Sequence, residues 1–131
     1  MKVEFLCPDR IEGPIVLNLT DDAESTDPEK FYMKEASVYR IRLTFRVHND
    51  IVHALKFCNI VSKMSVQVEK TEDVVGSYAP TTEDHVVELE QYETPSGYFK
   101  RGDYEGKAML ADGDGNIHWQ FSYPFRISKH W

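Results

Sequence analysis

The chain has 131 residues, 41% of them hydrophobic and 12% aromatic, which suits one compact globular domain and excludes a disordered chain. Its 22 acidic and 15 basic residues give a net charge of −7, which argues against binding to nucleic acid or anionic lipid and favours a basic partner. No apolar run reaches the roughly 20 residues of a membrane span, and the N-terminus lacks the basic start and apolar core of a secretory signal. We therefore expect a cytoplasmic protein without stable membrane association, unless a leader was removed.

Alternation of apolar and polar residues, with breaks at turn residues, predicts a series of short strands and no convincing helix. In chain order the expected segments are Lys2–Cys7, Pro14–Thr20, an apolar patch at Phe31–Met33, Ser37–Val47, one or two strands within Ile51–Glu69, Asp73–Tyr78, His85–Gln91, Glu105–Ala111 and Ile117–Ile127. Eight to nine such strands predict an all-β fold, an immunoglobulin-like β-sandwich rich in antiparallel pairs, formed by residues 1–131 as one domain.

The strongest pattern lies in the last of these segments, 117–127. Every second residue is large and apolar, and the residues between them are polar or proline. One face of this strand should therefore lie in the interior of the sandwich. The inward residues would be Ile117, Trp119, Phe121, Tyr123, Phe125 and Ile127. This aromatic face has two interpretations: an ordinary core filled by the second sheet, or a lipid slot between the two sheets.

Sites for catalysis, metal or cofactor are not indicated. Cys7 and Cys58 fit no metal or redox spacing, so we expect two free thiols. His48 and His53 lack further ligands nearby in the sequence. No nucleophile has the motif context of a hydrolase, and no two carboxylates are paired by the sequence in an apolar site. We predict a binding protein and not an enzyme.

The segment Asp112-Gly-Asp-Gly-Asn116 alternates oxygen-bearing side chains like the start of a calcium loop. However, Ile117 stands where such a loop needs glycine, and Tyr123 stands where it needs glutamate. The segment is therefore predicted to be a hairpin turn between the last two strands.

Several stretches resemble the Rho GDP-dissociation inhibitor family. They are Gly13–Thr20 (GPIVLNLT), Val38–Val52 (VYRIRLTFRVHNDIV), Val68–Pro80 (VEKTEDVVGSYAP), Gly97–Asp114 and the ending Ile127–Trp131 (ISKHW). The agreement runs in register from about Leu6 to Trp131, which is nearly the whole chain.

The resemblance implies a domain that takes the geranylgeranyl tail of a GDP-bound, prenylated Rho-family GTPase between its sheets, extracts the GTPase from membranes and keeps it in the cytoplasm. The family's prenyl-binding positions fall on Leu6, Phe31, Ile51, Phe99, Phe121 and Tyr123. The family usually has tryptophan at the positions of Phe121 and Tyr123, which implies a differently shaped slot here. Members also carry an N-terminal arm that grips the GTPase; without it, we expect lipid capture to survive and inhibition of nucleotide release to weaken.

Prenylated Rho proteins carry a basic segment beside the lipid, so the acidity of this chain suggests where the partner binds. We expect Glu88, Glu90 and Glu93 near the mouth of the slot to attract that segment, and Asp112 and Asp114 to face the body of the GTPase. Two other functions remain open: a carrier for other lipidated proteins, and an immunoglobulin-like interaction module that binds no lipid.

Overall fold

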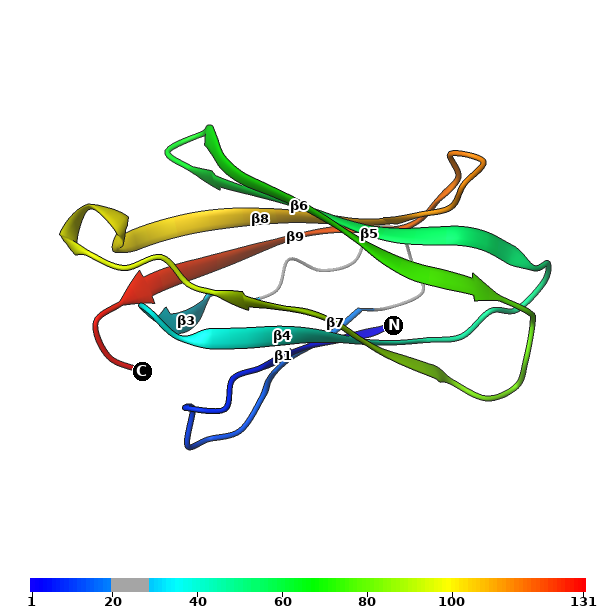
Figure 1. Ribbon diagram of the computed structural model, residues 1–131, viewed down its shortest axis with the longest axis horizontal. Coiled ribbons are helices and arrows are strands. Elements are labelled where there is room, and N and C mark those ends of the chain that lie inside the picture. Colours follow the sequence, from blue (N-terminus) through cyan, green and yellow to red (C-terminus); the bar gives the residue numbers. More distant parts are fainter. Residues whose placement is uncertain (20–28) are drawn as a thin grey trace.

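The computed structural model describes residues 1–19 and 29–131, and these form two β-sheets packed face to face (Figure 1). The four-stranded sheet has the order β2 (Ile15–Asn18), β1 (Lys2–Leu6), β4 (Val38–Phe45), β7 (His85–Glu93). The five-stranded sheet has the order β3 (Phe31–Lys34), β9 (Ile117–Ser128), β8 (Gly102–Ala111), β5 (Val52–Lys63), β6 (Val66–Tyr78). Only β3 and β9 pair in parallel among these strands. The predicted β-sandwich of eight to nine strands is confirmed.

Alternation along the strands builds the core, because successive side chains point to opposite faces of a sheet. In β4, Ile41, Leu43 and Phe45 are at most 4% exposed, while Arg42 and Thr44 between them lie on the outer face. In β9 the fully buried series begins at Phe121, and the predicted inward residue Trp119 is partly buried against the core. Ile117 is 54% exposed, so its predicted burial is wrong: the pairing of β9 with β8 shifts between Leu110 and Ala111, and the bulge turns the start of the strand outward.

The segment after residue 51, predicted as one or two strands within Ile51–Glu69 and a further strand at Asp73–Tyr78, forms a single long hairpin. Strand β5 ends at Lys63, and β6 then runs for 13 residues, so the separate strand predicted at Asp73–Tyr78 is wrong. Met64 and Ser65 make the turn with φ of 52° and 66°. Two-residue hairpin turns usually contain glycine or asparagine. Met64 and Ser65 are neither, so the local sequence did not indicate a turn here. Thr20, placed in the second predicted strand, lies outside the described residues.

One edge strand of each sheet, β7 in the four-stranded sheet and β6 in the five-stranded sheet, lies on the same side of the sandwich (Figure 1). Tyr92 on β7 donates its hydroxyl hydrogen bond to the carboxylate of Asp73 on β6, with oxygen distances of 3.0 and 3.1 Å. Asp73 is only 6% exposed, so this contact joins the two edges within the seam between the sheets. Toward residues 68–69 of β6 and Glu93 of β7, the sheets enclose a cavity.

Candidate functional site

A cavity of about 600 Å³ lies between the sheets and opens at the end of the seam where β7 leaves the sandwich. Its inner wall is made of buried or half-buried residues, none of which carries a charge: Phe5, Met33, Tyr39, Asn59, Val61, Thr94, Tyr104, Tyr123, Phe125 and Ile127. Its mouth is lined by exposed or half-exposed residues, four of them charged: Lys63, Val68, Glu69, Glu93, Pro95, Phe99 and Lys100. The cavity therefore offers an apolar interior and a polar entrance, as small-molecule sites usually do.

Stacked aromatic rings form one side of this cavity. The ring of Tyr123 stacks with those of Phe31 and Phe125, at centroid distances of 5.9 and 5.8 Å. Gly106, which pairs with Tyr123 across β8 and β9, leaves the room for this ring. A Cβ atom at Gly106 would lie 2.0 Å from Cζ of Tyr123. The ring of Tyr123 can therefore occupy this position only because residue 106 has no side chain.

The three tyrosines of the wall, Tyr39, Tyr104 and Tyr123, carry neutral hydroxyls. Tyr123 donates a hydrogen bond of 2.7 Å to Oδ1 of Asn59, which is itself buried on β5. Burial raises the pKa of Tyr123 far above its usual value. Burial, assisted by the negative charge of Glu69, raises the pKa of Tyr39 in the same way. The interior can therefore accept an uncharged, apolar ligand without exposing it to an ionised group.

The mouth is bordered by residues 94–101, which connect β7 to β8 and include the 3₁₀ turn η1 (Tyr98–Lys100). Thr94 is buried, and its hydroxyl donates to the carbonyl of Lys34 at 2.6 Å. Glu35 accepts hydrogen bonds from the Gly97 backbone N–H at 3.0 Å and from the Arg101 guanidinium at 2.9 and 3.0 Å. The hydrogen bond to Arg101 lowers the pKa of Glu35. These contacts hold the connection in one conformation at the entrance.

The predicted prenyl-binding residues divide into two groups. Tyr123 lies on the cavity wall and Phe99 at its mouth. Phe121 is buried beside Tyr123, at a centroid distance of 6.0 Å, but is not on the wall. Phe31 belongs to the aromatic stack but is not on the cavity wall, and it lines a separate hollow.

The remaining two, Leu6 and Ile51, lie away from the cavity. Leu6 ends β1 and pairs with Arg40 of β4. Ile51 is 55% exposed in the connection between β4 and β5. The inner-wall residues absent from the predicted prenyl-binding set are Phe5, Met33, Tyr39, Asn59, Val61, Thr94, Tyr104, Phe125 and Ile127. The alternation of β5 carries a signal for two of them, since Asn59 and Val61 share a face with the buried Phe57.

The predicted GTPase-contacting glutamates follow the free edge strand β7. Glu93 lies at the cavity mouth, and Glu90 is exposed between it and Glu88. Glu88 lies 3.9 Å from Nη1 of Arg42, on the outer face of the four-stranded sheet. The structure therefore places one of the three glutamates at the entrance and the other two along the strand leading away from it.

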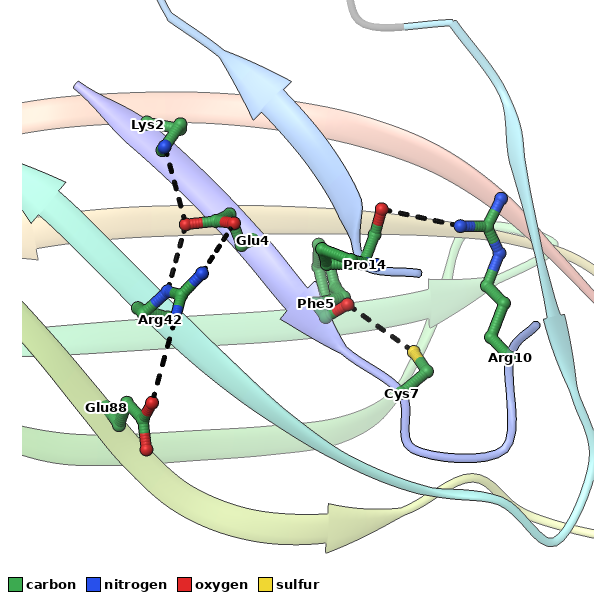
Figure 2. Close-up of polar contacts among 8 residues, drawn as sticks. All are labelled: Lys2, Glu4, Phe5, Cys7, Arg10, Pro14, Arg42 and Glu88. Carbon is green, nitrogen blue, oxygen red and sulfur yellow. Dashed lines mark hydrogen bonds and ion pairs between the residues drawn. The ribbon is translucent and has the colours of Figure 1, made fainter. Parts of the chain in front are cut away.

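Figure 2 shows that Glu88 is the outer member of a row of charges across β1, β4 and β7. At its centre Glu4, only 5% exposed, accepts two hydrogen bonds from Arg42 at 3.0 and 2.8 Å, with Lys2 at 3.6 Å. The hydrogen bond with Arg42 lowers the pKa of Glu4. Two-point pairing of this kind is geometrically specific, so the main partner of Arg42 is Glu4, and this pair connects β1 to β4. Glu88 makes only a longer, exposed contact with the same arginine.

The predicted aspartates lie in the hairpin between β8 and β9, at the opposite end of the sandwich from η1 (Figure 1). Asp112 accepts hydrogen bonds from His118 Nε2 at 2.8 Å and from the backbone N–H groups of Asp114 and Asn116 at 2.9 Å. The bond with His118 contributes most to lowering the pKa of Asp112 to about 2. Asp112 thus shapes the predicted hairpin turn, whereas Asp114 is exposed.

Several other properties of the described residues bear on function. Cys7 and Cys58 are free thiols. Within residues 1–19 and 29–131, no group of three or more His, Cys, Asp or Glu side chains is arranged to hold a metal ion. In the same ranges, no helix has the length and apolar character needed to cross a membrane.

A family model described as "RHO protein GDP dissociation inhibitor" matches residues 1–130. The chain belongs to the Rho GDP-dissociation inhibitor family. The family predicted from the resemblance is therefore confirmed.

Named relatives come from animals, plants and fungi. Rho GDP-dissociation inhibitor 1 of Homo sapiens is 35% identical over 119 residues, which cover 91% of this chain and 58% of the relative. Rho GDP-dissociation inhibitor 1 of Arabidopsis thaliana is 35% identical over 101 residues, covering 77% of this chain and 42% of the relative. The Rho GDP-dissociation inhibitor of Schizosaccharomyces pombe is 31% identical over 133 residues, covering 100% of this chain and 64% of the relative. The chain spans about three-fifths of the length of the Homo sapiens relative.

Proposed function

We propose that this member of the Rho GDP-dissociation inhibitor family binds the geranylgeranyl tail of a GDP-bound Rho-family GTPase in the cavity between its sheets. By holding the lipid, it extracts the GTPase from membranes and keeps it in the cytoplasm, as a binding protein without catalytic activity or cofactor. The observation that carries the proposal is the uncharged inner wall of the cavity of about 600 Å³, open at one end of the seam. Membership of the family supports the proposal that the lipid is attached to a Rho-family GTPase.

The hydrophobic transfer free energy of the prenyl chain cannot by itself drive its extraction from the bilayer into the cavity. A chain of about 20 carbons gives on the order of 16 kcal/mol on burial, at about 0.8 kcal/mol per CH₂. The bilayer provides nearly the same amount, so contacts with the protein part of the GTPase must decide the direction. Glu93 at the mouth, with Glu90 and Glu88 behind it on β7, is proposed to compete with anionic headgroups for the basic segment beside the lipid. At the other end of the sandwich, Asp114 is proposed to face the GTPase body, on a hairpin shaped by Asp112.

The proposal predicts that binding depends on the lipid. In a pull-down with a geranylgeranylated Rho GTPase and the same GTPase without its prenyl group, the prenylated form should be retained and the unprenylated form should bind at least about a hundredfold more weakly. Titration followed by fluorescence polarisation would measure both dissociation constants. Equal affinity for the two forms would exclude the cavity as the binding site and favour an interaction module that does not use lipid.

Charge reversal on β7 should slow the capture of the GTPase. The double variant E90K/E93K should reduce the association rate with geranylgeranylated GTPase about tenfold at low ionic strength, because attraction of the basic segment is lost. The difference should shrink as added salt screens the charges. The control E83K/E105K makes the same change in net charge at exposed positions outside the cavity lining. Equal rates for the two variants would remove the acidic edge from the mechanism.

A further inference from the structure

Exposed apolar side chains lie on the two segments that adjoin the mouth of the cavity. At the tip of the β5–β6 hairpin, Met64 is 89% exposed and Val66 64%. In η1, Tyr98 is 77% and Phe99 87% exposed. We call these four residues the apolar rim. Large apolar side chains in water are unfavourable, and a grouped set of them usually marks a surface that meets another apolar phase.

The two segments of the rim are fastened to each other. Lys63, the last residue of β5, donates hydrogen bonds from Nζ to the backbone carbonyls of Phe99 at 2.9 Å and Arg101 at 2.8 Å. The rings of Tyr98 and Phe99 meet edge to face at a centroid distance of 5.5 Å. In Figure 1 the hairpin tip and the connection with η1 both lie at the left end of the molecule. Hydrogen bonds from Lys63 thus hold the hairpin end of the rim against the connection that borders the entrance.

The chemistry of the rim suits the interfacial layer of a lipid bilayer. Tyrosine prefers that layer because its ring is apolar and its hydroxyl is polar, and lysine next to apolar residues keeps its ammonium group at the headgroups. Lys100 is exposed beside Tyr98 and Phe99, whereas the charge of Arg101 is balanced by Glu35 at 2.9 Å. At the mouth, Lys63 and Lys100 formally balance Glu69 and Glu93, although the whole chain carries −7. This end of the molecule can thus approach a bilayer without the repulsion that the rest of the surface would meet.

We infer that the apolar rim docks transiently on the bilayer surface, so that a prenyl chain passes from the membrane into the cavity without crossing water. The inference rests on the proposed function of the cavity and adds the lipid bilayer as a second contact of the same site. Docking explains how transfer proceeds at a useful rate: exposing the whole chain to water on the way would cost nearly its full transfer free energy. Because the contact is apolar, it requires no net positive charge and should occur on neutral vesicles.

The first test separates docking from lipid binding. The variant M64S/V66S/Y98S removes three rim residues that do not line the cavity. It should bind soluble geranylgeranyl-cysteine methyl ester with wild-type affinity, yet extract geranylgeranylated GTPase from phosphatidylcholine vesicles about tenfold more slowly. The control V74S/V86S/Y32S changes residues that are 75%, 60% and 53% exposed elsewhere on the chain, and it should extract at the wild-type rate.

A wild-type extraction rate in the rim variant would overturn the inference. So would weaker binding of this variant to the prenylated GTPase in solution without vesicles, since the rim would then be a protein interface. Failure of the wild-type chain to bind the soluble prenylcysteine would instead overturn the proposed function.

A second measurement detects docking directly. The variant Y98W places a fluorescent ring on the rim, and Y32W is its matched control at another exposed tyrosine. With vesicles of brominated phosphatidylcholine, the tryptophan emission of Y98W should be quenched more than that of the parent chain. The emission of Y32W should be quenched no more than that of the parent chain. Equal quenching of the two variants would contradict docking through the rim, whatever the outcome of the prenylcysteine titration.

Discussion

Replacement of Gly106 by alanine should destabilise the chain by about 3 kcal/mol, combining overpacking of the core with the loss of a buried hydrogen bond. The new methyl group would lie 2.0 Å from the ring of Tyr123. The ring must therefore leave its place beside Phe31 and Phe125 and give up its hydrogen bond to Asn59. Urea unfolding followed by circular dichroism would measure the change in the free energy of unfolding.

A double-mutant cycle shows whether this collision is the cause. In G106A/Y123L the smaller side chain relieves the clash, so the double variant should be more stable than the sum of the two single changes predicts. Additive effects would mean that Gly106 matters for another reason, such as its backbone conformation.

Filling the cavity should weaken lipid binding without unfolding the chain. Val61 is 8% exposed and lies on the cavity wall, so the larger ring in V61W can extend into the empty space. If the ring displaces three to four carbons of the prenyl chain, the loss of about 0.8 kcal/mol for each lowers affinity about a hundredfold. Isothermal titration with geranylgeranyl-cysteine methyl ester would measure the effect.

The matched control for this variant is V74W, at a valine that is 75% exposed on β6. It should bind as the wild type does. Thermal unfolding of both variants should remain near that of the wild type, because neither ring enters a filled core. Wild-type affinity in V61W would show that the lipid does not occupy this cavity.

Much of the fold could be predicted from local sequence. The alternation in residues 37–47 and in most of 117–127 identified two strands and the face that each buries. The turn at Met64–Ser65 could not be found in this way, because neither residue is typical of the left-handed conformation that both adopt. The bulge that exposes Ile117 likewise depends on the pairing of β8 with β9, which alternation within one strand does not specify.

The cavity was harder to predict than the strands, because its wall combines residues that meet only after the sheets assemble. Asn59 and Tyr123 are 64 positions apart and share a hydrogen bond across the five-stranded sheet. Met33 reaches the cavity through the parallel pairing of β3 with β9, which sequence spacing did not indicate. The family resemblance predicted Tyr123 and Phe99 as prenyl-binding residues, and both lie at the cavity. It also predicted Ile51, which lies in an exposed connection.

The hydrogen bond between Tyr92 and Asp73 has a mechanical consequence for the seam. It ties the edges of the two sheets together beyond the cavity, whereas the entrance at Val68 and Glu93 lies outside this tie. The spacing of the two layers is therefore fixed at this point of the seam. A guest too bulky for the cavity would have to widen the sandwich on the entrance side, where it meets the contacts that Glu35 and Lys63 make with the 94–101 connection.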